Sequence, residues 1–308
     1  MQGAKERMKD PVIYTIDLNF KGRSGTIGAY LVPHSKGAIL VETGPGSTIQ
    51  NLIAGIKKQG YDLGDITDIF LTHIHLDHAG ASGWMAQHGC QIHVHENGAP
   101  HLINPEKLLA SAGRLYGDMM GALWGEFIPV PETKITIMRD DEIVQIGDLS
   151  IRALNVPGHA SHHLAYLLGD ACFSGDIGGI RLSARQYLSL PLPPPDLNLE
   201  QWRASIHHIQ EFDPARMIPT HFGIYSDGKW HLQAVLAALD EVQSWVEEKM
   251  PSNPPIEELR QQFIEFEQQR AVKYGVEKSI VDGQQIANPS FMSADGIFRY
   301  WKKYRQTA

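Results

Sequence analysis

Between residues 72 and 80 the chain reads Thr72-His73-Ile74-His75-Leu76-Asp77-His78-Ala79-Gly80. Three histidines and an aspartate fall within six consecutive positions, a density that favours metal ligands over a histidine-rich surface loop. In an extended loop, positions i and i+2 project to the same side, so His73 and His75 can hold one metal ion. Asp77 and His78 follow and can serve a second ion beside the first. Imidazole mixed with carboxylate suits zinc or iron.

The flanking sequence places this segment between a strand and a helix. Residues 66–71 form a short apolar run that predicts a buried strand, and residues 79–89 have the small residues and final glycine of a helix. We therefore expect all four ligands on the loop that joins the two elements.

A site for two metal ions needs further ligands, and three later segments of the chain supply them. His159, Asp176 and His221 each follow an apolar strand-like run and are flanked by glycine or proline. Loops at strand ends, held by a rigid sheet, are where sites of defined geometry are usually built. Other histidines lack this context, and we interpret them as packing or surface residues: His88, His93, His95, His101, His207, His208 and His231.

The pattern H-x-H-x-D-H, followed by His, Asp and His at later strand ends, resembles the metallo-β-lactamase fold superfamily over about residues 12–225. The resemblance implies a four-layer αββα sandwich of the α/β (α+β) class. It also implies two divalent metal ions, zinc first with iron or manganese as alternatives. The implied ligands are His73, His75 and His159 for the first ion, Asp77, His78 and His221 for the second, and Asp176 as a bridge between them.

An aspartate at the bridging position resembles the glyoxalase II and lactonase branches, whereas the antibiotic-destroying enzymes lack that carboxylate. The implied function is hydrolysis of an ester or thioester by a hydroxide that bridges the metals. Asp77 is the implied catalytic residue, which would orient the hydroxide and take its proton. The chain shows no obvious acid beside Asp176, which fits a thioester better than an amide, because a thiolate needs little protonation to leave.

Several positions depart from the family pattern. Glu42-Thr43-Gly44 stands where many members have Asp-Thr-Gly, so a supporting carboxylate is retained with one methylene more. Gly179 occupies the position where acyl-homoserine lactonases place a tyrosine, which weakens that interpretation, and we see no counterpart of the basic cluster that holds glutathione in glyoxalase II. His162 and His163 are interpreted as supporting or packing residues rather than ligands.

Two functions of other classes stay open at this point. Persulfide dioxygenases share the fold but use a single iron, which would leave part of the second ligand set unused. A non-catalytic metal-binding or scaffold protein would bind metal without hydrolysing an ester. The complete set of seven ligands makes the non-catalytic protein the least favoured of the three functions.

Composition excludes some classes of partner. The 308 residues carry a formal net charge of -8 at pH 7 and are 43% hydrophobic, as is typical of globular chains and unlike nucleic-acid binders with a basic face. No apolar run approaches the roughly 18 residues of a membrane span, and the first residues lack an apolar signal region. We therefore expect no nucleic acid, no membrane and a cytoplasmic location. Cys90 and Cys172 are expected to be buried, reduced thiols.

The chain is expected to divide into a catalytic domain, residues 1–225, and a helical C-terminal extension, residues 226–308. Hairpin turns are predicted at Gly147-Asp148 and Gly169-Asp170. Strands are predicted at 12–19, 26–33, 37–42, 66–71, 91–95, 149–154 and 171–173, and helices at 48–59, 229–250, 256–274 and 296–305. The apolar faces of the extension are expected to pack on the domain or to form a homodimer contact.

Two segments are expected to select the substrate. Residues 102–130 carry a helical stripe of leucine, methionine and aromatic residues, which is a candidate lid although such stripes more often pack in a core. Residues 181–199 include three consecutive prolines and begin five residues after Asp176, with Arg181, Arg185 and Tyr187 as candidate contacts. Both segments are largely apolar, so we expect a small-molecule acyl substrate with an apolar part.

Overall fold

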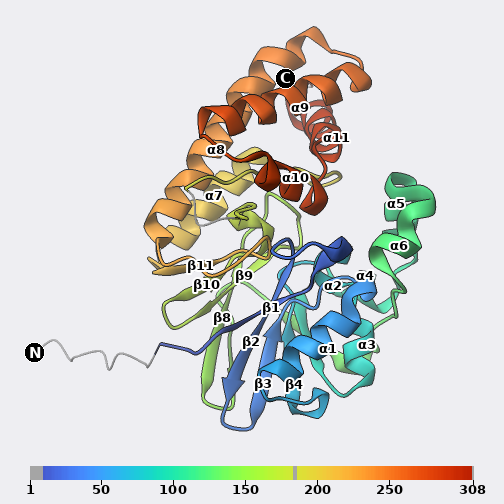
Figure 1. Ribbon diagram of the computed structural model, residues 1–308, viewed down its shortest axis with the longest axis vertical. Coiled ribbons are helices and arrows are strands. Elements are labelled where there is room, and N and C mark those ends of the chain that lie inside the picture. Colours follow the sequence, from blue (N-terminus) through green and yellow to red (C-terminus); the bar gives the residue numbers. More distant parts are fainter. Residues whose placement is uncertain (1–9, 183–185, 307–308) are drawn as a thin grey trace, which may run out of the picture.

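The protein is described by a computed structural model that covers residues 10–182 and 186–306. Two β-sheets pack against each other, and helices lie on the outer side of each (Figure 1). This is the αββα arrangement expected from the sequence. The helical C-terminal part of the chain stands at one end of the sandwich (Figure 1).

The first sheet has the strand order β1-β2-β3-β4-β5-β6. Strands β1, β2 and β3 pair antiparallel, and β3 to β6 pair in parallel. The strands are β1 (Tyr14–Asp17), β2 (Gly28–His34), β3 (Gly37–Val41), β4 (Ile66–Phe70), β5 (Gln91–His95) and β6 (Ile135–Met138).

The second sheet has the order β11-β10-β9-β8-β7. Its pairs are antiparallel except for β10 with β11, which are parallel. The strands are β7 (Ile143–Ile146), β8 (Leu149–Asn155), β9 (Leu164–Leu168), β10 (Ala171–Phe173) and β11 (Arg216–Ile218). The predicted glycine-aspartate turns join β7 to β8 and β9 to β10.

Three apolar cores correspond to the three interfaces between the four layers. Strand β2 shows how alternation sorts the side chains: Ala29 and Leu31 face the core under the helices of the first sheet, while Tyr30 and Val32 face the core between the sheets. All four are almost fully buried. Because both faces of this strand are covered, its sequence is apolar at consecutive positions rather than at alternate ones.

The helices are α1 (Ile49–Lys58), α2 (Leu76–Ala79), α3 (Ser82–Gln87), α4 (Ala99–Ile103), α5 (Glu106–Tyr116), α6 (Met120–Trp124), α7 (Leu199–Gln210), α8 (Gly228–Lys249), α9 (Ile256–Lys273), α10 (Lys278–Ala287) and α11 (Ser290–Tyr300). Of these, α1, α8 and α9 follow predicted helical segments closely, whereas α7 was not predicted. Short 3-10 turns lie at Phe20–Gly22, Gly46–Thr48, Leu63–Asp65, Gly117–Met119, Glu132–Lys134, Gly175–Gly178 and Met250–Ser252, and a π-helical turn at Trp301–Arg305 extends α11.

Three helix predictions need correction. The single helix expected over residues 79–89 is two short helices, α2 and α3, and α2 begins three residues before the expected start. Helix α10 was not predicted, and α11 begins at Ser290 rather than at residue 296. Polar residues and glycine interrupt the apolar pattern in these segments, so burial against neighbouring elements decides their boundaries more than local periodicity does.

Within the described residues, no helix combines the length and apolar character needed to cross a bilayer. Cys90 and Cys172 are buried free thiols, as predicted, and burial raises the pKa of each to about 12. The division of the chain at residue 225 stays a prediction. Helix α8, which lies beyond that position, packs beside α7 and contributes to the core under the second sheet.

Candidate metal centre

The histidine-rich segment turns from strand to helix at the edge of the first sheet. His73 and His75 lie in the connection after β4, whereas Asp77 and His78 belong to the first turn of α2. The expectation that all four lie in a loop is therefore wrong for the last two. The reason is local, because His75 is extended and ends the loop, so that the chain starts its helical turn at Leu76.

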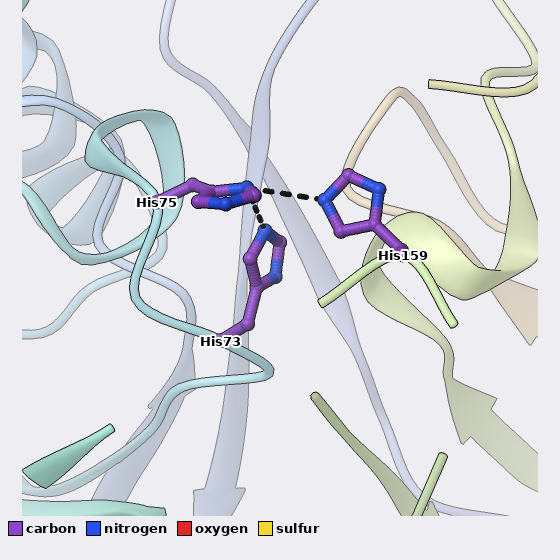
Figure 2. A group of neighbouring side chains, drawn as sticks. All are labelled: His73, His75 and His159. Carbon is purple, nitrogen blue, oxygen red and sulfur yellow. Dashed lines mark hydrogen bonds between the residues drawn. The ribbon is translucent and has the colours of Figure 1, made fainter. Parts of the chain in front are cut away.

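Three imidazoles from two distant parts of the chain meet in a first cluster (Figure 2). The Nδ1 atom of His75 lies 2.9 Å from Nε2 of His73 and 3.1 Å from Nε2 of His159. Nitrogen ligands at about 2.05 Å from a tetrahedral zinc ion would be about 3.3 Å apart. The three ring nitrogens therefore face a common point with nearly the spacing that a metal ion requires.

A second cluster is formed by Asp77, His78 and His221. The Oδ2 atom of Asp77 lies 3.3 Å from Nε2 of His221 and 3.5 Å from Nε2 of His78. His221 follows β11, the edge strand of the second sheet. Both sheets thus contribute to this cluster.

Asp176 lies between the two clusters, on the 3-10 turn after β10. Its Oδ1 atom is 3.3 Å from Nε2 of His78 and 3.4 Å from Nε2 of His221. Its Oδ2 atom is 3.4 Å from Nε2 of His159. One carboxylate oxygen is directed to each cluster, which is the arrangement of a bridging ligand.

The histidines are held by hydrogen bonds at their other ring nitrogen. Nδ1 of His159 lies 2.9 Å from the carbonyl oxygen of Pro191, and Nδ1 of His221 lies 2.8 Å from that of Thr26. A carbonyl oxygen can only accept, so each Nδ1 carries the proton. The Nε2 atoms are consequently free to act as metal ligands.

Glu42 supports His78 in the same way. This buried carboxylate lies 3.0 Å from Nδ1 of His78 and accepts hydrogen bonds from the hydroxyls of Thr72 and Thr220. The supporting role expected for the Glu42-Thr43-Gly44 segment is thus consistent with the direct contact between Glu42 and His78. Thr72 also lies 3.1 Å from Nδ1 of His73 through its hydroxyl, so Glu42 connects indirectly to the first cluster as well.

Burial and charge divide the imidazoles into two groups. Burial and neighbouring histidines hold the pKa of His73 well below its ordinary value and that of His75 at about 4, so both are neutral ligands. Burial alone would also lower the pKa of His78 and His221, but the carboxylates of Asp77 and Asp176 raise both. Positive charge is therefore favoured where those carboxylates meet.

The residues present fit divalent cations. Nε2 of His78 and Oδ1 of Asp176 are buried without a hydrogen-bond partner, although they belong to groups that are costly to leave unpaired. Both atoms face the space between the clusters. Imidazole nitrogen with carboxylate oxygen is the donor set that zinc, iron and manganese share.

The two histidines after His159 have different surroundings. Nε2 of His163 accepts hydrogen bonds from the backbone N–H groups of Asp176 at 3.1 Å and Ile177 at 3.4 Å. It therefore holds the turn that carries Asp176. His162 lines the cavity next to the clusters, and its Nδ1 is buried without a partner.

A cavity of about 390 Å³ opens beside the clusters. Four of the candidate ligands line it: His75, Asp77, His159 and Asp176. The rest of the lining comes mainly from α5, α6, residues 193–196 and the segment from α10 to α11. Sequence reasoning did not assign the last of these, since nothing local in that segment indicates that it approaches residues far earlier in the chain.

The predicted substrate contacts need correction. Neither Arg181 nor Tyr187 is among the described residues that line the cavity, and Arg185 lies outside the described residues. The guanidinium of Arg181 is bound instead by the carboxylate of Asp227, at 2.7 and 2.8 Å. The side chain of Tyr187 is buried against Arg270 and Tyr274. Proximity to Asp176 along the chain was a poor guide, because these two side chains pack against Asp227 and Arg270 and do not line the cavity.

The chain belongs to the metallo-beta-lactamase superfamily, a superfamily of metallo-hydrolases. The sequence model of that superfamily matches residues 25–221, which include the seven candidate ligands.

Individual relatives are distant. A metallo-beta-lactamase fold-containing protein of Sulfurisphaera tokodaii is 24% identical over 220 residues, which is 70% of this chain and 80% of the relative. A hydroxyacylglutathione hydrolase of Rhodopseudomonas palustris is 30% identical over 128 residues, which is 41% of this chain and only 38% of that enzyme. A metallo-beta-lactamase family protein of Thermus thermophilus has a similar fold, with a TM-score of 0.63 at 19% identity over 94% of this chain and 93% of its own.

Proposed function

We propose that the protein is a hydrolase of ester or thioester bonds that uses two divalent metal ions, zinc in the first instance. The observation that carries the proposal is the double orientation of Asp176, with one oxygen toward His78 and His221 and the other toward His159. A single metal ion needs no such bridge. The partial similarity to hydroxyacylglutathione hydrolases supports the acyl substrate class.

Bound cations would supply two kinds of chemistry here, a lowered pKa for water and stabilisation of the negative charge that develops on the carbonyl oxygen. His73, His75 and His159 would hold one cation, and Asp77, His78 and His221 the other. Asp176 would contact both.

Asp77 is the proposed proton acceptor. Burial alone would raise the pKa of this carboxyl, but His78 and His221 lower it below its ordinary value, so the group is ionised at neutral pH. It also lines the cavity, where a substrate carbonyl and the attacking water would meet. An ester or thioester suits this arrangement because its leaving group needs less protonation than an amine.

The first experiment is the metal content per chain by elemental analysis, paired with turnover of thioesters, lactones and aryl esters. Two metal ions with acyl cleavage would support the proposal. One iron per chain with oxygen uptake on a persulfide would place the protein among dioxygenases instead, and metal binding without turnover of any substrate would leave only a binding function.

Replacing Asp77 by asparagine tests the proton acceptor. We expect the D77N variant to lose at least about a hundredfold in kcat, in the range typical of general-base removal, with the metal content of each preparation measured in parallel. The matched control is Asp148→Asn, at an exposed turn of the second sheet, which should leave kcat unchanged. Turnover by D77N at the wild-type rate with full metal content would contradict the role.

A further inference from the structure

We propose that the cavity is an acyl chamber, a space that binds the acyl group of the substrate. It selects apolar acyl groups of medium length over short, polar acyl groups. The inference rests on the proposed function and names the substrate class of the same site. Three observations carry it: the face that α5 presents, the wall that α11 closes, and the size of the space.

Helix α5 presents one face to the cavity. Leu108, Ser111, Ala112, Leu115 and Tyr116 follow the spacing of a single helical stripe, and all five line the space. The stripe that the sequence suggested as core packing thus borders the cavity as well. The hydrogen-bonding groups that α5 offers to the cavity are Ser111, the Tyr116 hydroxyl and Lys107, which lies at the start of the helix.

The C-terminal part of the chain closes the opposite wall. Met292, in the first turn of α11, lies 3.3 Å from the hydroxyl of Tyr116 through its sulfur atom. The ring of Tyr116 packs edge-on against Trp124 of α6, with centroids 5.0 Å apart. Residues 193–195, all proline, add a stiff apolar border. Side chains from four separate segments therefore give the cavity a largely apolar wall, beside polar lining residues that include Asn97, His101, Asp196 and Asn288.

The metal end of the cavity fixes where the acyl carbon would lie. Asp77, His159 and Asp176 line the same space as Met292 and Tyr116. An acyl carbon placed at the candidate metal centre would direct its chain between α5 and α11. The acyl part of the substrate, rather than its leaving group alone, then contacts the apolar walls.

The volume sets the length of the chain. A cavity of about 390 Å³ holds about a dozen non-hydrogen atoms when each occupies about 30 Å³, the share of one water molecule. The ester or thioester group takes some of that space, which leaves about six to ten carbons for the acyl group. Each methylene that leaves water should raise kcat/KM by about two- to fourfold until the chamber is full.

The test is a chain-length series of thioesters from acetyl to dodecanoyl, with one common leaving group, on the metal-loaded enzyme. We expect kcat/KM to rise at least about 60-fold from acetyl to octanoyl and to fall beyond decanoyl. Met292→Trp should shorten the optimum by several carbons, and Met292→Ala should lengthen it. Phe291→Ala is the matched control, since this neighbour on α11 is 38% exposed and absent from the lining.

A second variant guards against misfolding of the first. Leu115→Trp fills the chamber from α5 and should shorten the optimum in the same direction as M292W, with circular dichroism confirming that both variants fold. Active wild-type enzyme with a flat chain-length profile, or with a preference for S-lactoylglutathione over octanoyl thioesters, would overturn the chamber while the hydrolase proposal stands.

If no acyl substrate is cleaved, the hydrolase proposal fails. The chamber proposal is then tested separately by the binding of an apolar probe. Calorimetric titration with n-octanol, a neutral probe, should show binding to the wild type and binding to M292W that is weaker by about tenfold or more. Equal binding by the two proteins, or none by the wild type, would refute the chamber on its own.

Discussion

At the scale of single residues, the candidate centre depends on side chains that are never ligands themselves. Glu42 binds His78 and also accepts hydrogen bonds from Thr72 and Thr220, which precede His73 and His221 in the sequence. One buried carboxylate thereby connects the two segments that carry His73, His78 and His221. Its backbone has a φ of 67°, a conformation that non-glycine residues rarely adopt, and the surrounding contacts must stabilise it.

Replacing Glu42 by glutamine should weaken the second metal site more than the first. The amide keeps the size of the side chain but removes the negative charge beside His78 and places a donor near the backbone N–H of Thr72. We expect the affinity of the weaker-bound metal ion to fall about 10- to 100-fold, measured by competition with a chelator.

The control for this change is Glu96→Gln, because Glu96 is an exposed carboxylate paired with Arg139 on the surface. The E96Q variant should bind both metal ions with the affinity of the wild type. If E42Q bound both ions as tightly as the wild type, the support attributed to Glu42 would be wrong.

His231 gives a second prediction, on stability. This buried imidazole lies 2.7 Å from the carbonyl oxygen of Gly178 through Nε2 and 3.4 Å from the guanidinium of Arg181 through Nδ1. It is therefore neutral, with the proton on Nε2. Burial first, and then Arg181, lower its pKa from 6.5 to about 4, while the hydrogen bond to Gly178 and the nearby carboxylate of Asp227 oppose this.

The sign of the pH effect follows from that shift. Between pH 6.5 and about 4 the unfolded chain binds the proton and the folded one does not, so acid favours unfolding. From pH 7 to pH 5 this histidine should cost the wild type about 2 kcal/mol of unfolding free energy, a loss that His231→Gln avoids. Denaturant titrations of both proteins at the two pH values measure the difference, and parallel losses would refute the assignment.

At the scale of elements, the loop after β11 shows why Arg181 matters although it does not line the cavity. Its backbone N–H donates to the carbonyl oxygen of His221, and its own carbonyl oxygen accepts from the N–H of Phe222 at 3.1 Å. Its guanidinium lies over the rings of Tyr225 and Trp230, at 3.9 and 4.6 Å from their centroids. Arg181 thus contacts the segment that carries His221 in two ways, through backbone hydrogen bonds and through its guanidinium.

Replacing Arg181 by methionine should loosen this loop. The guanidinium is buried and forms two hydrogen bonds to Asp227, whose side chain is 34% exposed. Because solvent reaches one partner, we expect a loss of about 2–4 kcal/mol in unfolding free energy, toward the low end for a broken buried pair. The metal ion that we propose His221 to bind should also be lost at lower chelator concentrations than in the wild type.

Arg203→Met is the matched control, because Arg203 pairs with Asp240 at 2.8 Å on the surface. Breaking that exposed pair should cost less than about 1 kcal/mol and leave the metal content unchanged. Equal effects of the two substitutions would show that Arg181 contributes no more than a surface charge.

Sequence reasoning worked best where the signal is local. The spacing of His73, His75, Asp77 and His78, and the strand ends before His159 and His221, identified residues that the structure brings together. It did less well for Arg181, which lies near Asp176 along the chain but whose guanidinium is bound by Asp227 at the start of α8. The direction in which a loop leaves a strand depends on its distant partners, here Asp227 and His221, and no local pattern encodes them.

At the scale of the whole molecule, the helical extension and the sandwich share one core. Leu154 of β8 and Met217 of β11 belong to the same apolar cluster as Leu232 of α8 and Phe263 of α9. Figure 1 shows α8 beside α7, with one end near β11 and with α9 and α11 near its other end. The extension therefore supplies the outer layer of the sandwich as well as a wall of the cavity, and an amphipathic pattern alone could not assign it to either.

A fragment of residues 1–225 should consequently fail to fold. It would lose α8, whose Leu232, Val235, Leu239, Val242 and Val246 are at most 2% exposed. At about 2 kcal/mol for each buried side chain, their burial contributes about 10 kcal/mol, which is comparable to the entire stability of a typical domain. A fragment of residues 1–252 keeps α8 but loses Leu259, Phe263 and Ile297 of the same core, so it should melt at a lower temperature than the full chain. Circular dichroism and thermal melting of the two fragments measure this, and a cooperative transition in the 1–225 fragment at the temperature of the full chain would show that the sandwich is complete without α8.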